Sequence, residues 1–328
     1  MSQRTMAVVG TGVIGNGWIA RFLANGHRVF AYDPAPEAEA NTRRMLDDSW
    51  STLVQYGIHK DASKDNLTFV QNLEDAVAHA DLIQENVPER ETLKKQVLAS
   101  IDHHAKPDAI IASSTSGYMP SVLQEACVKN PERVIVAHPF NPVYLIPLVE
   151  IAGGKQTAIA TINEAKQIYD ELNMKPLVMS GEIDGHIGDR LMEALWREAL
   201  HIVNDGVATT EEVDKAIVYG PGLRWALMGP FLTLHLAGGN EGMKHMLEQF
   251  GPALKLPWTR LIAPELTEDL KKKVIDGTSA QCGEISIADM EHRRDRFLIK
   301  LMGLLEEEGF WPSERVLAYE RNIDAVER

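Results

Sequence analysis

The segment that most constrains the fold of this chain is AVVGTGVIG at residues 7–15, an apolar run that leads directly into the pattern G-x-G-x-x-G. In a strand–turn–helix unit, the first glycine permits the tight turn and the second lets the backbone approach a pyrophosphate. The third lets the helix pack closely on the strand. The helix that follows directs its first backbone amides and its positive dipole end at the phosphates. The pattern therefore predicts a dinucleotide site, whose candidate residues are Gly10, Gly12, Val13, Ile14 and Gly15.

An acidic residue at the end of the second expected strand extends this prediction. Asp33 lies 18 positions after Gly15, near the separation at which a carboxylate accepts hydrogen bonds from the hydroxyl pair of a ribose. The same carboxylate repels a 2′-phosphate, so the sequence favours NAD over NADP as the cofactor. The alternative is a structural glycine turn together with a turn-forming Asp before Pro34.

The first half of the chain alternates short β-like runs with helical patterns. The runs are Thr5–Val9, His27–Tyr32, Leu82–Glu85, Ala109–Ser113 and Val134–Ala137. Such alternation favours an α/β fold with a doubly wound parallel sheet of the Rossmann type. Because the β-like runs stop after about residue 184, we expect two domains. An NAD-binding domain is predicted at 1–183, and an all-α domain for substrate binding and dimerisation at 184–328.

Helix signals mark the start of the second half. Apolar residues recur at helical spacing between Asp189 and Asn204, and Gly206 is suited to end that helix. Thr209 and Glu212 have the spacing of a capping box for a second helix. Pro230 is placed for the first turn of a third helix.

Composition and charge exclude several classes of function. The net charge of −14 argues against a nucleic-acid partner, which selects basic surfaces. No run of 18 apolar residues lacks a charge, and the N-terminal apolar segment meets Gly10 too early for a signal peptide, so we expect neither a membrane span nor secretion. Cys127 and Cys282 lie far apart and fit thiols in a reducing compartment, which favours the cytoplasm. No clustered His or Cys residues have the spacing of metal ligands, so no metal is expected.

Three polar groups stand out beyond the second half of the expected sheet, at whose carboxyl edge open α/β sheets bind ligands. They are Ser116 after the run Ala109–Ser113, His138 after the run Val134–Ala137, and Glu150 at the end of Leu148–Glu150. Oxidation of an alcohol by hydride transfer needs a base for the hydroxyl proton, and histidine suits that role near neutral pH. A carboxylate on its other nitrogen would orient it, and a serine hydroxyl would hold the substrate oxygen. Spacing alone leaves a structural histidine, a solvated acid and a turn or helix-capping serine equally open.

Four sequence blocks, together with the glycine pattern, resemble the 3-hydroxyacyl-CoA dehydrogenase family. The blocks are Ser113–Ser116, His138–Pro142, Leu148–Glu150 and Met228–Phe231, and the likeness runs through most of the first 240 residues. The resemblance implies His138 as the acid/base, Glu150 as its partner and Ser116 as a hydroxyl-binding residue. It also implies Asn141 as the supporting residue after the histidine.

The chain departs from the family pattern at one position. The family usually has an Asn-Arg pair where this chain reads Asp189-Arg190, and an ionised Asp cannot donate the hydrogen bond that the Asn gives to the substrate oxygen. Asp189 is instead either a charge partner for a positive substrate or an acid placed at a helix N-terminus by the helix dipole.

The segment Gly220–Pro230 is similar to the branch of the family that acts on short substrates with a free carboxylate. An arginine can clamp a carboxylate through two parallel hydrogen bonds, which makes Arg224 the candidate, against the alternative of an exposed loop arginine. No basic cluster for a CoA thioester is evident in the second half. The likeness favours L-carnitine as the substrate, over L-gulonate and L-3-hydroxyacyl-CoA.

A trimethylammonium group donates no ordinary hydrogen bond, so aromatic faces and carboxylates must hold it. Aromatic residues near the motifs are candidates for such a cage, with core packing as the alternative: Phe140, Tyr144, Trp196, Trp225 and Phe231. The family resemblance implies a homodimer formed through the helical domain. A competing class is a non-catalytic NAD(H)-binding protein, which would not require Ser116, His138 and Glu150 together.

Overall fold

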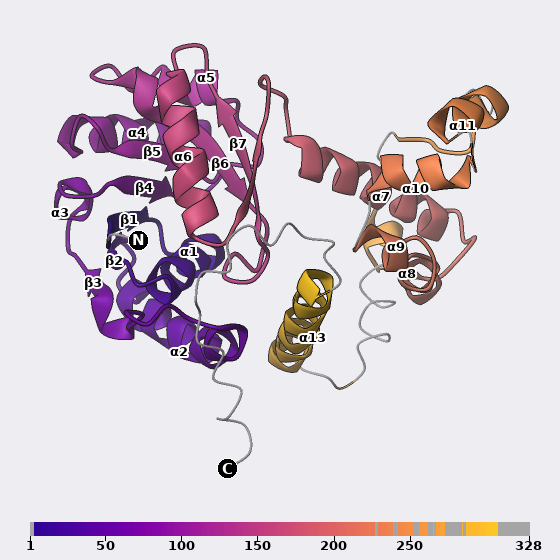
Figure 1. The fold of residues 1–328 in the computed structure, drawn as a ribbon, viewed down its shortest axis with the longest axis horizontal. Coiled ribbons are helices and arrows are strands. Elements are labelled where there is room, and N and C mark those ends of the chain that lie inside the picture. Colours follow the sequence, from indigo (N-terminus) through magenta and orange to yellow (C-terminus); the bar gives the residue numbers. More distant parts are fainter. Residues whose placement is uncertain are drawn as a thin grey trace. The chain divides into compact units, whose positions relative to one another are not determined.

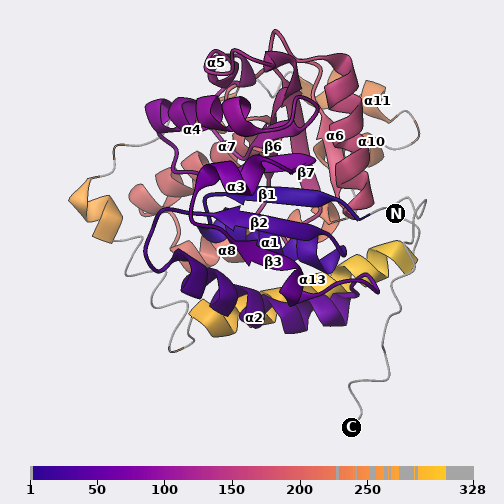
Figure 2. The ribbon, with the colours of Figure 1, turned by 90° about the vertical axis from the view of Figure 1, so that its left-hand side faces the viewer.

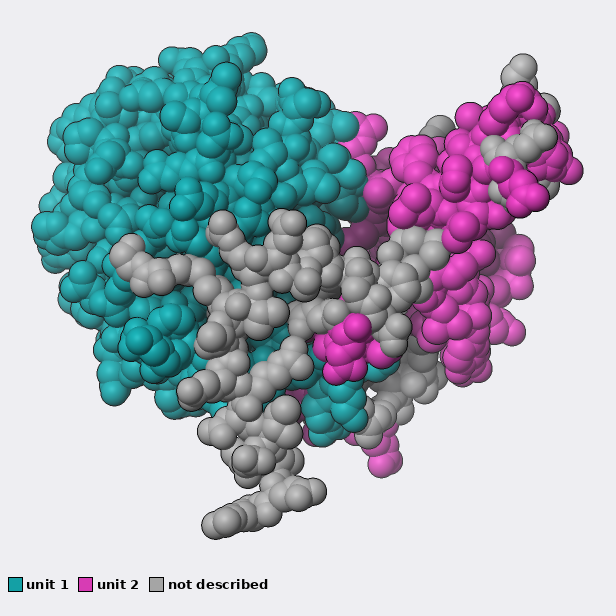
Figure 3. Space-filling view, viewed as in Figure 1, with its two compact units in different colours: residues 1–189, 295–300, 313–328 teal, residues 190–294, 301–312 magenta. Residues whose placement is uncertain are grey.

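The computed structural model describes residues 3–226, 229–238, 240, 242–251, 256–261, 265, 267–272, 284 and 287–307. Met228 and Cys282 of the sequence analysis lie outside this set. The described residues form two compact units (Figure 3), the first made of 3–189 and 295–300 and the second of the others from 190 onward. Within the described part of the chain, no helix is both long and apolar enough to cross a membrane.

The first unit is built on one eight-stranded sheet with the order β3-β2-β1-β4-β5-β6-β7-β8. The strands are β1 (Thr5–Val9), β2 (Arg28–Tyr32), β3 (Leu67–Phe69), β4 (Leu82–Glu85), β5 (Ile110–Ser113), β6 (Val134–Pro139), β7 (Leu148–Gly153) and β8 (Lys175–Val178). The winding direction reverses between β1 and β4, and a ligand crevice forms outside the carboxyl ends of the strands at such a point. The predicted doubly wound α/β fold is confirmed.

Helices cover both faces of this sheet, as Figures 1 and 2 show. They are α1 (Val13–Ala24), α2 (Ala38–Tyr56), α3 (Leu73–Val77), α4 (Glu91–His104), α5 (Pro120–Gln124) and α6 (Ile159–Glu171), with short 3-10 turns at Lys64–Asn66 and Pro131–Arg133. Alternate residues of β1 face opposite layers: Met6 and Val8 pack with α1, α2 and α6, whereas Ala7 and Val9 pack with α3, α4 and α5. Because both faces are buried, the central strands are continuous apolar runs without alternation.

The sheet differs from a purely parallel one at a single pair. β6 and β7 are antiparallel, whereas the other neighbouring strands are parallel. The reason is the length of the connection, because residues 140–147 are too few for the crossover helix that joins parallel strands. The strands β3, β7 and β8 were not expected from the sequence. β3 has only three residues, and β8 lies at the sheet edge with three of its four side chains exposed.

The second unit contains only helices among its described residues. They are α7 (Ile187–Asn204, of which the first three residues belong to the first unit), α8 (Thr210–Val218), α9 (Gly222–Trp225), α10 (Pro230–Ala237), α11 (Met243–Phe250) and most of α13 (Ile287–Glu307). The predicted capping box of Thr209 and Glu212 is confirmed at the start of α8. Pro230 occupies the first turn of α10, and Gly206 follows α7 with a φ of 70°. The predicted helix signals are therefore confirmed.

Candidate active site

The glycine loop between β1 and α1 has the geometry of a phosphate cradle. Gly10 has a φ of +88°, and a Cβ there would lie 2.8 Å from the backbone of Asn86. A Cβ on Gly15 would lie 1.9 Å from the Gly10 carbonyl oxygen, so the helix can reach the strand only without a side chain. A Cβ on Gly12 would meet nothing within 4 Å, which leaves open space over the loop.

The N-terminus of α1 lies at this loop, and no acidic side chain in its first turn offsets the positive end of the helix dipole. Gly12 caps the helix without a side-chain hydrogen bond, and the first turn, which begins with Val13 and Ile14, contains no acidic residue. The first amides and the positive dipole end are therefore available to an anion. The open space at Gly12 and these amides fit the pyrophosphate of a dinucleotide.

The carboxylate of Asp33 is held in place at the end of β2. The amide of Thr11 donates to its Oδ2 at 2.8 Å, and the amide of Ala35 donates to its Oδ1 at 2.9 Å. The Thr11 hydroxyl also donates to Oδ2, at 3.4 Å, whereas Oδ1 has a further acceptor position, because a carboxylate oxygen accepts more than one hydrogen bond. The tie to Thr11 links the acid directly to the glycine loop, which fits the predicted contact with a ribose.

Replacing Asp33 with alanine is expected to weaken NAD binding roughly 10- to 100-fold, because one or two charge-assisted hydrogen bonds are lost. NADP should lose much less affinity, since repulsion of its 2′-phosphate is also removed. Titration of both cofactors by NADH and NADPH fluorescence measures the change. Glu37→Ala, with the same loss of charge on an exposed neighbour, is the control. An unchanged preference for NAD in Asp33→Ala would rule out the ribose role.

His138 and Glu150 lie directly opposite each other on β6 and β7. The distance from His138 Nδ1 to Glu150 Oε2 is 3.1 Å, and both side chains are buried. With Nδ1 as the donor, the proton-accepting lone pair of the neutral ring is on Nε2. Cross-strand pairing thus brings together the two residues that were predicted to form the acid/base pair.

The other oxygen of Glu150 is bound by the start of α7. The amides of Ile187 and Gly188 each donate to Oε1 at 3.0 Å. Burial by itself raises the pKa of Glu150, but the hydrogen bonds from His138 and from these amides outweigh it and hold the pKa below the ordinary value. Glu150 is thus an anion that can orient His138 and stabilise its charged form.

The ring of His138 is packed between two other rings. Phe140 lies edge-on to it, with the ring centroids 5.4 Å apart, and His186 stacks on it with the centroids 5.0 Å apart. A Cβ on Gly188 would lie 2.4 Å from the Phe140 ring, so the close packing depends on this glycine. Of the predicted aromatic residues, Phe140 is the one that contacts the histidine.

His186 is a residue that the sequence analysis missed. It is buried in a left-handed conformation with a φ of 49°, and its Nε2 lies 3.0 Å from the carbonyl oxygen of Thr115. Its Nδ1 is buried and has no hydrogen-bond partner among the described residues. Burial is the main cause that lowers the pKa of His186, which keeps the ring neutral beside His138. The only sequence signal was its position after Gly185, three residues before Asp189.

Asp189 lies at the other nitrogen of the same histidine. Its Oδ2 is 3.5 Å from His138 Nε2, and the Asp189 side chain is 25% exposed, against 1% for Glu150. His138 therefore has a carboxylate at each ring nitrogen, one enclosed and one open to solvent. Both interpretations of Asp189 from the sequence are compatible with this position. As an acid at a helix N-terminus it lies in the first turn of α7, and as a charge partner for a substrate it lies beside the base.

An ion-pair network around the buried Lys94, also missed from the sequence, supports the loop that contains Ser116. Lys94 Nζ, on α4, lies 3.0 Å from Glu85 Oε1 and 3.3 Å from Glu89 Oε2. Glu89 in turn accepts from the Thr115 hydroxyl and from the Gly117 amide, the latter at 3.0 Å. Ser116 lies between these two anchored residues and is exposed at the carboxyl edge of the sheet.

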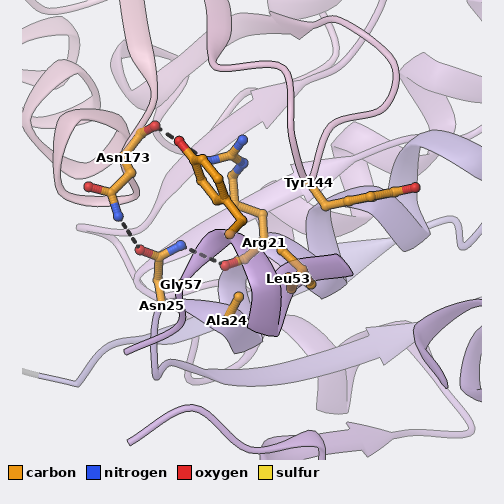
Figure 4. A pocket seen from close by; sticks show the side chains of 8 residues that line it. Arg21, Ala24, Asn25, Leu53, Gly57, Tyr144 and Asn173 are labelled. Carbon is orange, nitrogen blue, oxygen red and sulfur yellow. Dashed lines mark hydrogen bonds between the residues drawn. The ribbon is translucent and has the colours of Figure 1, made fainter. Parts of the chain in front are cut away.

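Two predicted residues of the 140–147 connection are not brought to His138 by any described contact. Asn141 is exposed. Tyr144 packs against the core next to α1, and its hydroxyl donates to Asp295 Oδ2 at 2.8 Å. A small pocket lies beside Tyr144 (Figure 4) and is lined in part by Arg21, Asn25 and Asn173.

The remaining substrate candidates belong to the second unit. Trp196 is on α7, Arg224 and Trp225 are on α9, and Phe231 is on α10. All four side chains are exposed. Arg224 forms no ion pair with any residue that the structure describes.

The described site can perform one kind of chemistry well. A neutral imidazole with Nδ1 on a buried carboxylate has Nε2 free to take a proton from a hydroxyl group. It lies at the same edge of the sheet as the glycine loop. The arrangement suits proton removal from an alcohol while a hydride leaves for a bound nicotinamide.

Comparison with known proteins gives a consistent result. Residues 5–183 match the family model "3-hydroxyacyl-CoA dehydrogenase, NAD binding domain", and residues 185–276 match the C-terminal domain of the same family. The chain is 65% identical over 311 residues to an L-carnitine dehydrogenase of Bacillus cereus, covering 95% of this chain and 94% of that one. It is 59% identical to an L-carnitine dehydrogenase of Oceanobacillus iheyensis, covering 94% of this chain and 100% of that one.

Among solved structures, the chain is similar to 5-formyl-3-hydroxy-2-methylpyridine 4-carboxylic acid 5-dehydrogenase, an NAD+-dependent dismutase. The TM-score is 0.77 at 30% sequence identity, and the match covers 93% of this chain and 99% of that one.

Proposed function

Because the chain belongs to the 3-hydroxyacyl-CoA dehydrogenase family, we propose that it oxidises the 3-hydroxyl group of L-carnitine with NAD. The products are 3-dehydrocarnitine, NADH and a proton. The observation that carries this proposal is the His138–Glu150 pair beside a glycine loop that fits a dinucleotide. Relatives named for carnitine oxidation, which are 52–65% identical to this chain, support the choice of substrate.

His138 acts as the general base of this reaction. Its Nε2 takes the hydroxyl proton of the substrate, and bound NAD supplies the acceptor for the hydride that leaves the same carbon. Glu150 keeps the proton of His138 on Nδ1 before the reaction and stabilises the imidazolium afterwards. Ser116 binds the substrate oxygen, for which its exposed hydroxyl beside the anchored Thr115 is suited. Asn141 supports the histidine, as in the family pattern.

Arg224 binds the carboxylate of carnitine, because its guanidinium is exposed and forms no ion pair with a described residue. The trimethylammonium group contacts aromatic faces, of which Phe140 is the one packed beside His138. Trp196, Trp225, Phe231 and Tyr144 are further candidates for this contact.

The protein acts as a cytoplasmic homodimer in this proposal. Helices α7 and α10 expose large apolar side chains to an extent that is unusual for a surface in water. They are Leu191, Met192, Leu195, Trp196, Phe231, Leu232, Leu234 and Leu236. A second copy would cover them through the same patch on both subunits. The mass in solution tests this, and a monomer at micromolar concentration would contradict it.

Initial rates of NAD reduction with four substrates test the proposed activity. They are L-carnitine, D-carnitine, L-gulonate and L-3-hydroxybutyryl-CoA, assayed side by side at equal concentration. Activity with L-carnitine and little with the others is expected. Activity with gulonate or the CoA ester alone would show that the assigned substrate is wrong and that the assigned dehydrogenase chemistry is right. NADH binding without turnover of any of the four would favour a non-catalytic binding protein.

A further inference from the structure

The second carboxylate at His138 has no evident structural task. Glu150 is buried and accepts three hydrogen bonds, whereas Asp189 is partly exposed and has no hydrogen bond to a described residue. No lysine or arginine among the described residues lies within 4 Å of the Asp189 carboxylate. Its Oδ2 lies 3.5 Å from His138 Nε2, the nitrogen that must accept the proton of the substrate.

The proposed reaction requires His138 in its neutral form, and in that form the contact with Asp189 is unfavourable. A neutral His138 that donates through Nδ1 to Glu150 presents a lone pair at Nε2. Asp189 Oδ2 then faces that lone pair at 3.5 Å with no proton between the two acceptors. The neighbouring His186 ring is held neutral, mainly by burial, and adds no compensating positive charge. A hydroxyl group that donates to Nε2 therefore lies beside the Asp189 carboxylate, and a cation that accompanies it can balance that negative charge.

We propose that Asp189 is a specificity-determining residue that selects substrates with an ammonium group attached to the carbon next to the carbinol. The hydroxyl donates to His138 Nε2 while the adjacent ammonium group neutralises Asp189. This inference rests on the proposed function and deepens it, because carnitine has this arrangement of hydroxyl and trimethylammonium groups.

Charge, and not shape, is what Asp189 contributes in this proposal. An asparagine at this position has nearly the same size and can donate a hydrogen bond, but it cannot balance a cation. An aromatic surface such as Phe140 attracts a quaternary ammonium group more weakly and also accepts a neutral group of the same shape. The two contributions can therefore be separated by a substrate with the shape of carnitine and no charge.

The experiment compares L-carnitine with 3-hydroxy-5,5-dimethylhexanoate of matching configuration, in which a tert-butyl group replaces the trimethylammonium group. Values of kcat/KM for both are measured by NADH formation in the wild type, Asp189→Asn and Asp184→Asn. Asp184 is an exposed acid five residues earlier, so its variant is a control for the change in net charge.

We expect Asp189→Asn to lower kcat/KM for L-carnitine on the order of 100-fold, as for a lost close charge pair. The kcat/KM for the neutral analogue should change by no more than a few-fold, so that the variant loses most of its preference for the charged substrate. Asp184→Asn should keep the wild-type preference. The ratio of the two substrates within one variant does not depend on the fraction of folded enzyme.

Two results for Asp189→Asn would overturn the proposal while leaving the proposed function intact. An equal loss with both substrates would mean that Asp189 acts only through His138. If Asp189→Asn still prefers L-carnitine over the neutral analogue, groups other than Asp189 bind the trimethylammonium group. If the wild type itself fails to oxidise L-carnitine, the proposed function is wrong and this assignment falls with it.

Discussion

Replacing His138 with alanine is expected to lower kcat by roughly 10²- to 10⁴-fold, the usual contribution of a positioned general base. The physical reason is that Glu150 contacts Nδ1 and His186 is buried against Thr115, while the described group beside Nε2 is the Asp189 carboxylate. A carboxylate is ordinarily a much weaker base than an imidazole. The NADH affinity should stay within a few-fold, since the glycine loop and Asp33 are untouched. Initial rates and NADH fluorescence titration measure the two effects.

A double variant provides the control for this result. Because Glu150 acts through His138, adding Glu150→Gln to His138→Ala should cost much less than Glu150→Gln costs the wild type. Full additivity would mean that Glu150 acts independently of the histidine. A folded His138→Ala protein that no longer binds NADH would contradict the assignment of His138 to proton transfer.

Replacing Glu150 with glutamine is expected to lower kcat by about 10³- to 10⁴-fold, close to the loss seen when the acid of a catalytic histidine is replaced by its amide. The amide oxygen of glutamine can still accept from Ile187 and Gly188, so its NH₂ group would face His138. The histidine must then accept at Nδ1 and keep its proton on Nε2, where it cannot act as a base. The loss should appear in kcat, with KM for L-carnitine changed little.

The pH dependence of stability gives an independent measurement on the same variant. The pKa of Glu150 is held below its ordinary value of 4.5 in the folded state, so the unfolded chain takes up a proton first as the pH falls. The ion thus stabilises the fold above about pH 4.5, and this stabilisation is lost as the pH falls through the folded-state pKa. Glu150→Gln should lose less stability than the wild type on acidification below pH 4.5, measured by chemical unfolding. An identical pH dependence in both proteins would contradict the charged state of Glu150.

The fold was predictable because its signals are local. The glycine pattern and the apolar runs each depend on neighbouring residues, and all five predicted strands are present. The reversal of β7 was also within reach, since the connection 140–147 is too short for a crossover, but no strand was expected at Leu148–Gly153. The edge strand β8 is half polar and exposed, so its pattern could not be distinguished from a loop.

The site was predictable only where residue type matched a chemical role. His138 and Glu150 were found because a base needs an orienting acid, and the structure places them 3.1 Å apart. His186 and Lys94 were missed because their roles depend on contacts between segments far apart in the chain. His186 reaches Thr115, 71 positions earlier. Lys94 is a buried cation whose partners become evident only once α4 packs on the sheet.

His138 and Glu150 lie opposite each other in the ladder between β6 and β7. This placement separates the geometry of the proton-transfer pair from the choice of substrate. The hydrogen-bonded register of the two strands sets the distance between base and acid, and the side chains of the connection 140–147 lie outside that ladder. Substitutions at exposed positions of the connection that keep its length can therefore alter which alcohol is accepted while the proton-transfer pair keeps its geometry. During evolution, the substrate specificity of such a chain can therefore change while its proton-transfer chemistry is kept.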